Sequence, residues 1–532
     1  MTSAPWWQSG VIYQIYPRSF QDSRGTGVGD LQGIIQRLTH VVELGANAIW
    51  INPFFQSPMA EFGYDIADYR AIDPAFGDMA DFDELVAAAH GHGLKVILDL
   101  VPNHTSDQHP WFIESRSSRN SRKRDWYIWR NPGDSGGPPN NWLSEFGCSA
   151  WTCDAGSGQY YYHAFLAAQP DLNWRNRDVR DAIYEVMRFW MRRGADGFRI
   201  DVVWHLIKDD QFRDNPINPD AGAPPHECLL PLYTTDRPEL HQVIAEMRQV
   251  VDEFPDRVLI GEIYLPIERL VAYYGQNLGG LHLPFNFSLL SSPWDARVIA
   301  KLIDEHESYL PDGGWPNWVL GNHDRPRIAS RVGAAQARIA AMLLLTLRGT
   351  PTIYYGDEIG MKQARIAPDR LRDPLAKSMS GLGRDGCRTP MQWDETERAG
   401  FSRSQPWLPI SRDFRTCNVA LQRNESTSIY NLYRRLIRAR RERRALTRGH
   451  YRPLKATGNL LLFVRETKTE RILVALNLGN DPISVSFPSE RLSGQVLVSA
   501  FGDRDRERLR TTIDLRGNEG VVVELDKATV LP

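Results

Sequence analysis

Eight short apolar runs of strand length alternate with stretches of helical spacing along most of this chain. The runs lie at 11–16, 48–52, 95–101, 197–201, 258–262, 280–285, 317–320 and 350–355. The clearest helical stretch is 81–90, where Asp81 and Glu84 are spaced to form a capping box and Gly93 is placed to end the helix. Eight strands that alternate with helices predict an α/β fold, a (β/α)8 TIM barrel whose chemistry lies on the loops after the strands.

Three of these runs lead into a carboxylate. Asp201 and Glu262 are the last residues of their runs, and Asp324 follows closely after the run 317–320. Polar residues begin many loops, so one such run alone indicates little. Because the carboxyl ends of barrel strands open into one mouth, we expect the three carboxylates to lie together. Carboxyl groups gathered in this way are the groups that cleavage of a glycosidic bond requires.

The chain is too long for one barrel. It has 532 residues, whereas a barrel takes about 250. The alternation stops at 104–169, which we interpret as a B domain inserted after the third strand, and again in a long excursion at about 356–427. Strand-like runs separated by turn residues predict an antiparallel β domain at 450–532. The barrel is therefore expected to comprise 1–103 and 170–449.

The charges of the chain nearly cancel, with 63 Lys and Arg against 65 Asp and Glu and a formal net charge of −2. This balance gives no field for nucleic acid or for an anionic membrane, and it is compatible with a neutral partner such as a sugar. The first residues lack the basic head and apolar run of a signal peptide, and no later segment offers about 18 uninterrupted apolar residues. We therefore expect a soluble, cytoplasmic protein, and its oligomeric state stays unknown.

Six motifs occur along the chain in a fixed order. They are Asp-Leu-Val-Pro-Asn-His at 99–104, Gln-Pro-Asp-Leu-Asn-Trp at 169–174, Gly-Phe-Arg-Ile-Asp at 197–201, Gly-Glu at 261–262, Gly-Asn-His-Asp at 321–324 and Gly-Asp-Glu-Ile-Gly at 356–360. Together they resemble the α-amylase superfamily, glycoside hydrolase family 13. The segments 14–20 and 388–393 resemble its branch of α-glucosidases and oligo-1,6-glucosidases.

The resemblance covers nearly the whole chain. It implies the barrel, the inserted B domain and the C-terminal β domain. It also implies a retaining, exo-acting α-glucosidase that releases glucose from short α-glucosides such as maltose and needs no catalytic cofactor. Because a covalent intermediate can be taken by any hydroxyl that reaches it before water, glucosyl transfer to an acceptor is a second outcome.

The resemblance assigns the catalytic roles. Asp201 is the nucleophile, Glu262 is the acid/base, and Asp324 is a third carboxylate that binds sugar hydroxyls and stabilises the transition state. Arg199 lies two residues before Asp201, so both side chains should point to one face of their strand. A guanidinium there would hold Asp201 ionised, while burial and a neighbouring anion would keep Glu262 protonated.

The resemblance also assigns substrate-binding residues. His104 and His323 match two histidines that hydrogen-bond the sugar at the cleavage subsite. Asp65 and Arg388 match a charged pair that holds the terminal 4-hydroxyl and closes the pocket beyond it. The candidates for an apolar wall, with ordinary packing as the alternative for the second, are Tyr64 and Phe165.

A glycine-rich loop near the N-terminus resembles the family's metal loop, in which alternating oxygen ligands suit a hard cation such as Ca²⁺ or Mg²⁺. Its candidate ligands are Asp22, Arg24, Thr26, Val28 and Asp30. Relatives usually have Asn and Asp where this chain has Arg24 and Thr26, so backbone carbonyls would replace those side chains. The alternative to a structural cation is a turn satisfied by water.

The residues after the nucleophile give conflicting indications of linkage. Val202 resembles members that act on α-1,6 bonds, whereas 204–208 resembles proteobacterial α-glucosidases that act on short substrates. The linkage therefore stays open. A sucrose-active or isomerising relative is the alternative enzyme, and a non-catalytic relative is disfavoured because the three carboxylates are intact.

Overall fold

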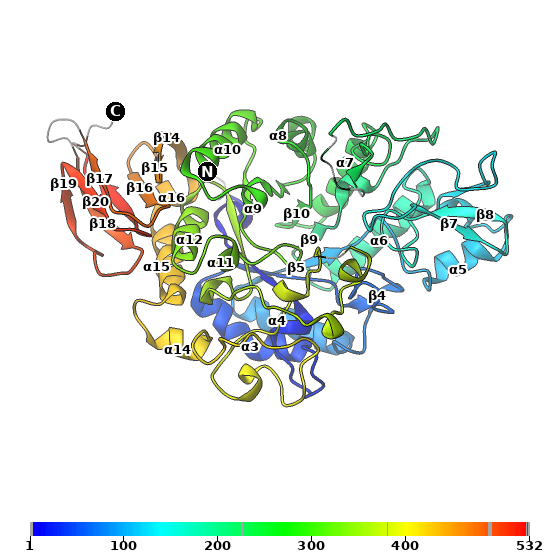
Figure 1. The fold of residues 1–532 in the computed structure, drawn as a ribbon, viewed down its shortest axis with the longest axis horizontal. Helices are drawn as coiled ribbons and strands as arrows, with labels where there is room; N and C mark the ends of the chain where they lie inside the picture. Colours follow the sequence, from blue (N-terminus) through cyan, green and yellow to red (C-terminus); the bar gives the residue numbers. More distant parts are fainter. Residues whose placement is uncertain are drawn as a thin grey trace.

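Eight parallel strands form a closed barrel at the centre of the molecule (Figure 1). The structure is a computed structural model that describes residues 4–220, 222, 224, 227–379, 381–487, 492–527 and 529. The barrel strands are β1 (Ile12–Ile15), β2 (Ala48–Ile51), β5 (Lys95–Leu100), β9 (Gly197–Ile200), β10 (Val258–Gly261), β11 (Leu283–Pro284), β12 (Asn317–Val319) and β13 (Thr350–Tyr354). A parallel bridge between Asn286 and Trp318 joins the two ends of the hydrogen-bonded order and closes the ring. The predicted barrel is confirmed, and each predicted run contains one of these strands.

Helices follow the strands and bury one apolar face each against the barrel. The longer ones are α3 (Leu31–Leu44), α4 (Met79–Gly91), α6 (Arg177–Arg192), α7 (Leu240–Asp252), α10 (Ala296–Tyr309), α12 (Gln336–Thr346) and α15 (Ile429–Glu442).

The helix expected at 81–90 is confirmed as α4, and Gly93 follows it in the left-handed conformation with φ 74°. The predicted capping box is wrong. Asp78 is the N-cap: its carboxylate accepts the Asp81 N–H at 3.1 Å, while the Asp81 carboxylate accepts the Asp78 N–H at 2.9 Å. The capping box therefore lies about one turn earlier than predicted. Asp81, at the third helical position, accepts the hydrogen bond for which a Glu was expected.

A second, smaller sheet lies between β5 and α6 in the sequence and beside the barrel in space (Figure 1). It is antiparallel, and its three strands in spatial order are β6 (Trp129–Arg130), β8 (Gln159–Tyr162) and β7 (Trp151–Asp154), preceded by helix α5 (Pro110–Ser117). Trp142, Trp151 and Tyr162 give this region an apolar cluster of its own. This is the inserted β region that the fold class predicts.

The C-terminal part of the chain forms an antiparallel sheet at the opposite end of the molecule from β7 and β8 (Figure 1). Its order is β14 (His450–Thr457), β15 (Leu460–Glu466), β16 (Arg471–Asn477), β21 (Gly520–Leu525), β18 (Ser493–Ser499) and β19 (Arg508–Arg510), with a separate pair of β17 (Ile483–Ser486) and β20 (Thr512–Leu515). Phe463 and Val474 share an apolar core with Leu343 of α12 and Leu436 of α15. The predicted C-terminal β domain is confirmed, and it packs on the barrel helices.

Shorter elements complete the described chain. They are α1 (Trp6–Ser9), α2 (Pro17–Phe20), β3 (Phe55–Gln56), β4 (Asp68–Ile72), α8 (Ile267–Leu270), α9 (Ser288–Ser291), α11 (Ile328–Arg331), α13 (Pro374–Ser378), α14 (Val419–Asn424) and α16 (Arg444–Arg448), with 3₁₀ turns that include Val203–His205 and Asp385–Cys387. None of the helices in the described part of the chain has the length and apolar composition that crossing a bilayer would require.

Candidate active site

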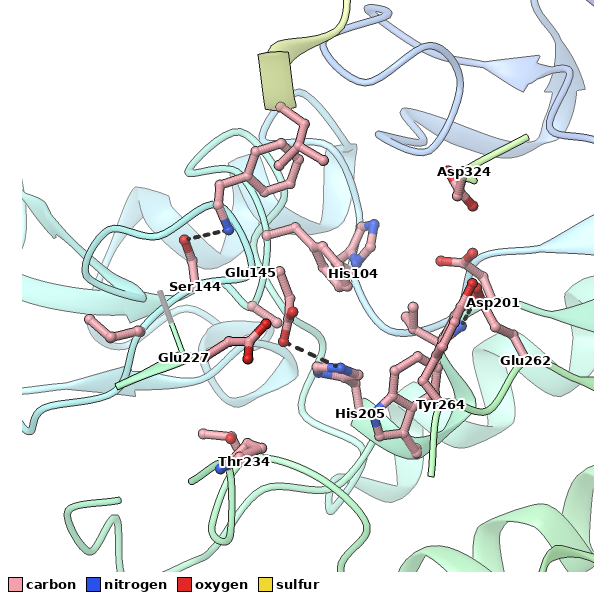
Figure 2. Close-up of a pocket in the computed structure, with 18 of the residues that line it drawn as sticks. His104, Ser144, Glu145, Asp201, His205, Glu227, Thr234, Glu262, Tyr264 and Asp324 are labelled. Atoms are coloured by element: carbon pink, nitrogen blue, oxygen red, sulfur yellow. Dashed lines mark hydrogen bonds and ion pairs between the residues drawn. The ribbon is translucent and has the colours of Figure 1, made fainter. Parts of the chain in front are cut away.

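A cavity of about 640 Å³ opens at the carboxyl ends of the barrel strands, and Asp201, Glu262 and Asp324 all line it (Figure 2). Asp201 and Glu262 follow directly after β9 and β10. These strands are neighbours in register, with Ile200 opposite Gly261, so their carboxyl ends deliver the two side chains to one place. The three carboxylates that the sequence singles out therefore share one cavity.

Arg199 forms ion pairs with three carboxylates of the site. Its Nη1 lies 2.7 Å from Asp99 Oδ1 and 2.6 Å from Asp201 Oδ1, and its Nη2 lies 2.6 Å from Glu262 Oε2. The guanidinium is buried, with 1% of the side chain exposed. One permanent positive charge thus serves three carboxylates, and the same-face geometry expected for Arg199 and Asp201 is present.

Three carboxylates surround one guanidinium in this cluster. Burial raises the pKa of Asp201 well above its ordinary value and raises that of Glu262, and the charge of Arg199 opposes burial without outweighing it. Contrary to the expectation from the sequence, Arg199 alone therefore does not hold Asp201 ionised. Burial likewise raises the pKa of Asp99 to about 6 against the same opposition. The charge of Glu262 also raises the pKa of Asp201, so the protonation of each of these two groups depends on the other. One ionised and one protonated carboxyl group is the pair that a retaining glycosidase needs.

The backbone after Asp201 is strained, and it orients Glu262. Val202 has φ 37° and ψ 47°, a left-handed conformation that is an outlier for a β-branched residue. Such strain costs about 1–3 kcal/mol and persists where the surroundings over-determine it. Here the Val202 N–H donates to Glu262 Oε2 at 3.0 Å. The residue type at Val202 indicates only linkage, and nothing in the sequence predicts this contact with Glu262.

Asp324 is held ionised by two arginines. Arg388 Nη2 lies 2.8 Å and Arg384 Nη1 3.2 Å from Asp324 Oδ1, and His323 Nε2 lies 3.1 Å from Oδ2. Burial alone would raise the pKa of Asp324, and its neighbours His323, Arg388 and Arg384 outweigh burial and lower it. Because burial also lowers the pKa of His323 and keeps that ring neutral, we assign most of the effect on Asp324 to the arginines.

The expected clamp between Asp65 and Arg388 is wrong. Asp65 is fully buried, and its carboxylate accepts the Ser57 hydroxyl at 2.9 Å and the Ala60 and Glu61 N–H groups at 2.8 and 2.9 Å. Arg388 lies behind Asp324 and donates from Nε to the carbonyl of His323 at 2.8 Å. Neither side chain lines the cavity. Asp65 instead shapes the turn 57–61.

A different charged pair lines the cavity beside Asp324. Glu61 and Arg384 both line it, and Arg384 Nη2 lies 2.8 Å from Glu61 Oε1. Asp373 anchors the same guanidinium at 2.7 Å. Sequence analysis missed both residues, although each is a charged side chain within four positions of a motif residue, Glu61 before Tyr64 and Arg384 before Arg388.

The remaining predicted binding residues line the cavity beside the carboxylates. Tyr64 Oη lies 2.6 Å from His323 Nε2, and the two rings stack with centroids 5.6 Å apart. Burial lowers the pKa of His104 to about 4, so His104 is neutral, and its Nε2 lies 3.1 Å from Gln169 Nε2. The Phe165 ring packs against the His104 ring with centroids 5.1 Å apart and also lines the cavity. Phe165 therefore both packs within the protein and forms part of the cavity wall.

Comparison with known proteins identifies the family. Residues 14–449 match the family described as alpha amylase, catalytic domain. The chain belongs to this α-amylase family, glycoside hydrolase family 13. It is 43% identical over 524 residues to a probable alpha-glucosidase of Rhizobium meliloti (strain 1021), a match that covers 94% of this chain and 95% of the relative.

Other relatives of this α-amylase family member match over almost their full length. An oligo-1,6-glucosidase of Heyndrickxia coagulans is 38% identical over 565 residues, covering 98% of this chain and 100% of the relative. The solved structure of the alpha-glucosyl transfer enzyme XgtA superposes with a TM-score of 0.93 at 39% identity, covering 98% of this chain and 100% of that one. A trehalulose synthase, MutB, superposes at 0.91 with 34% identity and the same coverage.

The loop that resembles the family's metal loop does not fit a cation in this chain. The Asp22 carboxylate accepts the N–H groups of Arg24, Gly25 and Gly27 at 3.1, 2.8 and 2.7 Å. Asp30 caps helix α3 by accepting the Gly33 N–H at 2.7 Å. A hard cation needs free oxygens, and these carboxylates already accept donors. The described residues contain no group of three or more His, Cys, Asp or Glu side chains that could hold a metal ion.

The departures from the family pattern explain this misfit. The exposed Arg24 side chain lies over Asp30, with Nε 3.5 Å from Asp30 Oδ2 and Nη1 donating to the Pro74 carbonyl at 3.1 Å. The Thr26 hydroxyl and the Val28 carbonyl bond each other at 3.2 Å. A guanidinium therefore stands beside Asp30, where a cation would be repelled, and the expected set of Ca²⁺ or Mg²⁺ ligands is not assembled.

Proposed function

We propose that this family member is a retaining, exo-acting α-glucosidase that releases glucose from the non-reducing end of short α-glucosides such as maltose. The observation that carries the proposal is the closed inner end of the cavity. Glu61, Arg384 and Asp324 form a connected charged wall there, so no further sugar can extend beyond the glucose that contacts Asp201. A cavity of about 640 Å³ suits a ligand of disaccharide size.

The chemistry follows from the two coupled carboxyl groups. The ionised Asp201 attacks the anomeric carbon while the bond from that carbon to the leaving oxygen breaks, and Glu262 transfers its proton to that oxygen. Glu262 then removes a proton from water, which attacks the same carbon and releases Asp201. If an acceptor hydroxyl replaces water in the second step, the product is a new glucoside. No cofactor takes part.

Binding roles follow the same geometry. We assign Tyr64, His104, Phe165 and His323 to the walls of the glucose subsite, and Arg199 to the orientation of Asp201. Asp324, kept ionised by its arginines, binds sugar hydroxyls. The partners of the enzyme are then a small neutral α-glucoside and a hydroxyl acceptor.

Three further expectations stay predictions. They are a cytoplasmic location, the division of the chain into a barrel (1–103 and 170–449), a B domain (104–169) and a C-terminal domain (450–532), and the absence of nucleic-acid and membrane partners. The near-zero net charge of −2 supports the last.

Two alternatives to the hydrolysis of maltose remain. Relatives named oligo-1,6-glucosidase and trehalulose synthase share most of this chain, so α-1,6 hydrolysis and sucrose isomerisation are the alternatives to maltose hydrolysis. A product time course on maltose, isomaltose, sucrose and trehalose separates them. Stereochemistry is followed on an aryl α-glucoside, because its leaving group is not a sugar and all the glucose formed carries the attacked anomeric carbon. We expect α-glucose as the first product, detected by NMR before mutarotation. First appearance of β-glucose from this substrate would contradict a retaining mechanism, and isomeric disaccharides formed from sucrose would favour the isomerase.

A further inference from the structure

The wall of the cavity that faces away from Asp324 is built differently from the inner end. It is formed by residues 143–146 of the inserted region and by the long loop between β9 and α7. Figure 2 shows Ser144, Glu145, His205, Glu227 and Thr234 on this side, across from Asp201, Glu262 and Asp324. We call Ser144, Glu145, His205, Glu227 and Thr234 the outer wall.

The outer wall lies where a leaving group must go. If the glucose to be cleaved is held between Asp201 and the Glu61–Arg384 pair, the rest of the substrate can extend only away from that closed end. This assignment rests on the proposed function.

Glu145 and His205 leave room for a ligand hydroxyl. His205 Nε2 lies 3.8 Å from Glu145 Oε1, which is too long for a direct hydrogen bond. Burial lowers the pKa of His205 well below its ordinary value, so the ring is neutral and no ion pair forms. His205 Nδ1 is buried without a hydrogen-bond partner among the described atoms, and the side chain is 4% exposed. The atom that stands beside the Glu145 carboxylate is Nε2 of this neutral ring, and a ligand hydroxyl, which both donates and accepts, can contact the two together.

The outer wall carries a carboxylate, Glu145, that faces the cavity beside the neutral His205. Glu145 is open to the cavity, with 55% of its side chain exposed, yet protein surrounds it, and burial and the charge of Glu227 raise its pKa to about 7. An anion placed here would add to this repulsion, whereas hydroxyl or ammonium donors would relieve it.

The two arginines that line the described cavity contact residues other than Glu145. Arg384 is already in contact with Glu61, Asp324 and Asp373 at the inner end. Arg325 lies over the Tyr264 ring, 5.3 Å from its centroid, on the catalytic side.

We propose that Glu145 and His205 form a leaving-group subsite for an uncharged or amino-bearing sugar, and that the Glu145 carboxylate makes this subsite reject anionic sugars. Glu145 is thus the specificity-determining residue for the charge of the leaving group. Substrates whose second sugar carries a phosphate or carboxylate are expected to be poor.

The test uses three α-1,4-linked disaccharides with glucose at the non-reducing end and glucose, glucosamine or glucuronic acid as the leaving sugar. In the wild type we expect kcat/KM for the glucuronic acid compound to be at least about tenfold below that for maltose, and the glucosamine compound to match or exceed maltose. Glu145→Gln keeps the shape of the side chain and should remove most of this difference. Glu114→Gln is the matched control, since Glu114 is 48% exposed, lies outside the cavity and should leave all three values unchanged.

A second measurement keeps the result independent of turnover. Calorimetric binding of the three disaccharides to Asp201→Asn should give the same order of affinity. Adding Glu145→Gln should reduce the differences in affinity among them. Equal kcat/KM and equal affinity for the three compounds in the wild type would overturn the proposal. Equal losses of kcat/KM for all three in Glu145→Gln would overturn it as well. If no compound is hydrolysed by wild type while the binding order still holds, the proposed function fails and the charge preference stands.

Discussion

Arg384 at the inner end of the cavity contacts three carboxylates within 3.2 Å, whereas Glu145 on the outer wall faces a neutral histidine at 3.8 Å. The inner end is thus a prearranged network in which the positions of the charges are set before substrate binds. The outer wall is a place where a ligand would complete the polar contacts. This difference teaches that the glucose subsite is specified by rigid pairing, while the leaving-group side is specified by the sign of its charge.

The largest effect is expected between the two ends, at the nucleophile. Asp201→Asn should lower kcat by about four orders of magnitude or more, because an amide cannot form the glycosyl ester. Since the side chain keeps its size, the circular dichroism spectrum should not change. A mechanism-based fluoro-sugar should label Asp201 in the wild type, as mass spectrometry of the digested protein would show. Labelling of another carboxylate would mean that Asp201 is not the nucleophile. The position of the inner end relative to the cleaved bond would then have to be assigned again.

The acid/base should give the next largest effect. Glu262→Gln is expected to lower kcat/KM on maltose by about 10²–10⁴, the usual contribution of a general acid. Substrates with an activated phenolate leaving group need little protonation and should lose much less in the first step. Rates on maltose and on an aryl α-glucoside, measured side by side, test this. Equal losses on both would mean that Glu262 is not the acid.

Removing Arg384 tests whether the ion pairs at the inner end are needed for binding glucose. Arg384→Ala leaves Glu61 and Asp373 without their partner, and removing one member of a buried ion pair costs about 3–5 kcal/mol. We expect kcat/KM on maltose to fall by about 10²-fold or more, far beyond the loss of one neutral hydrogen bond, worth about 1 kcal/mol. Arg325→Ala is the control, because this exposed arginine also lines the cavity but lies outside the network. Similar losses for both variants would show that the pairing at the inner end is not special.

The same closed end should govern chain length. Wild type is expected to release glucose units one at a time and to act poorly on soluble starch. Product analysis that found rapid release of maltose-sized fragments would mean that the inner end is open.

The smallest effect concerns pH at the outer wall. With a pKa of about 7, Glu145 is mostly neutral below that pH and mostly ionised above it. Discrimination against the glucuronic acid compound should therefore increase by a few-fold between about pH 6 and pH 8, since charge on Glu145 is what repels the anion. His205 stays neutral over this range, because its pKa is well below its ordinary value. The ratio of kcat/KM for maltose and for the glucuronic acid compound cancels titration of the shared catalytic groups. The ratio should be flat in Glu145→Gln, and a flat ratio in wild type would contradict the assignment.

Much of the architecture could be predicted because it depends on local patterns. Each barrel strand is buried on both sides and so appears as a continuous apolar run, as in β2 and β13. The carboxylates proposed as catalytic could be found for the same reason: Asp201 and Glu262 stand directly at the ends of two such runs. The capping box of α4 was misplaced by about one turn, because several acids precede that helix and spacing alone does not select among them.

The substrate-binding end could be predicted only in part. Tyr64, His104 and His323 lie within motifs and line the cavity as expected. Asp65 and Arg388 also lie within motifs, but their side chains are used for the turn 57–61 and for Asp324. A motif gives the identity of a residue and its place on the chain. It does not tell which way the side chain turns when several charged neighbours compete for the same space.

The sequence by itself determined the barrel, the C-terminal sheet and the meeting of three carboxylates at the barrel mouth, because period, burial and order along the chain are local properties. Only the tertiary structure decided what closes the cavity and what lines its outer wall. Glu61 and Arg384 are separated by 323 positions, and Glu145 and His205 come from the inserted region and from a barrel loop. Such pairs form where separate elements meet. The free energy of burying a charge selects the partner there, and that partner depends on distances and orientations that no local pattern contains.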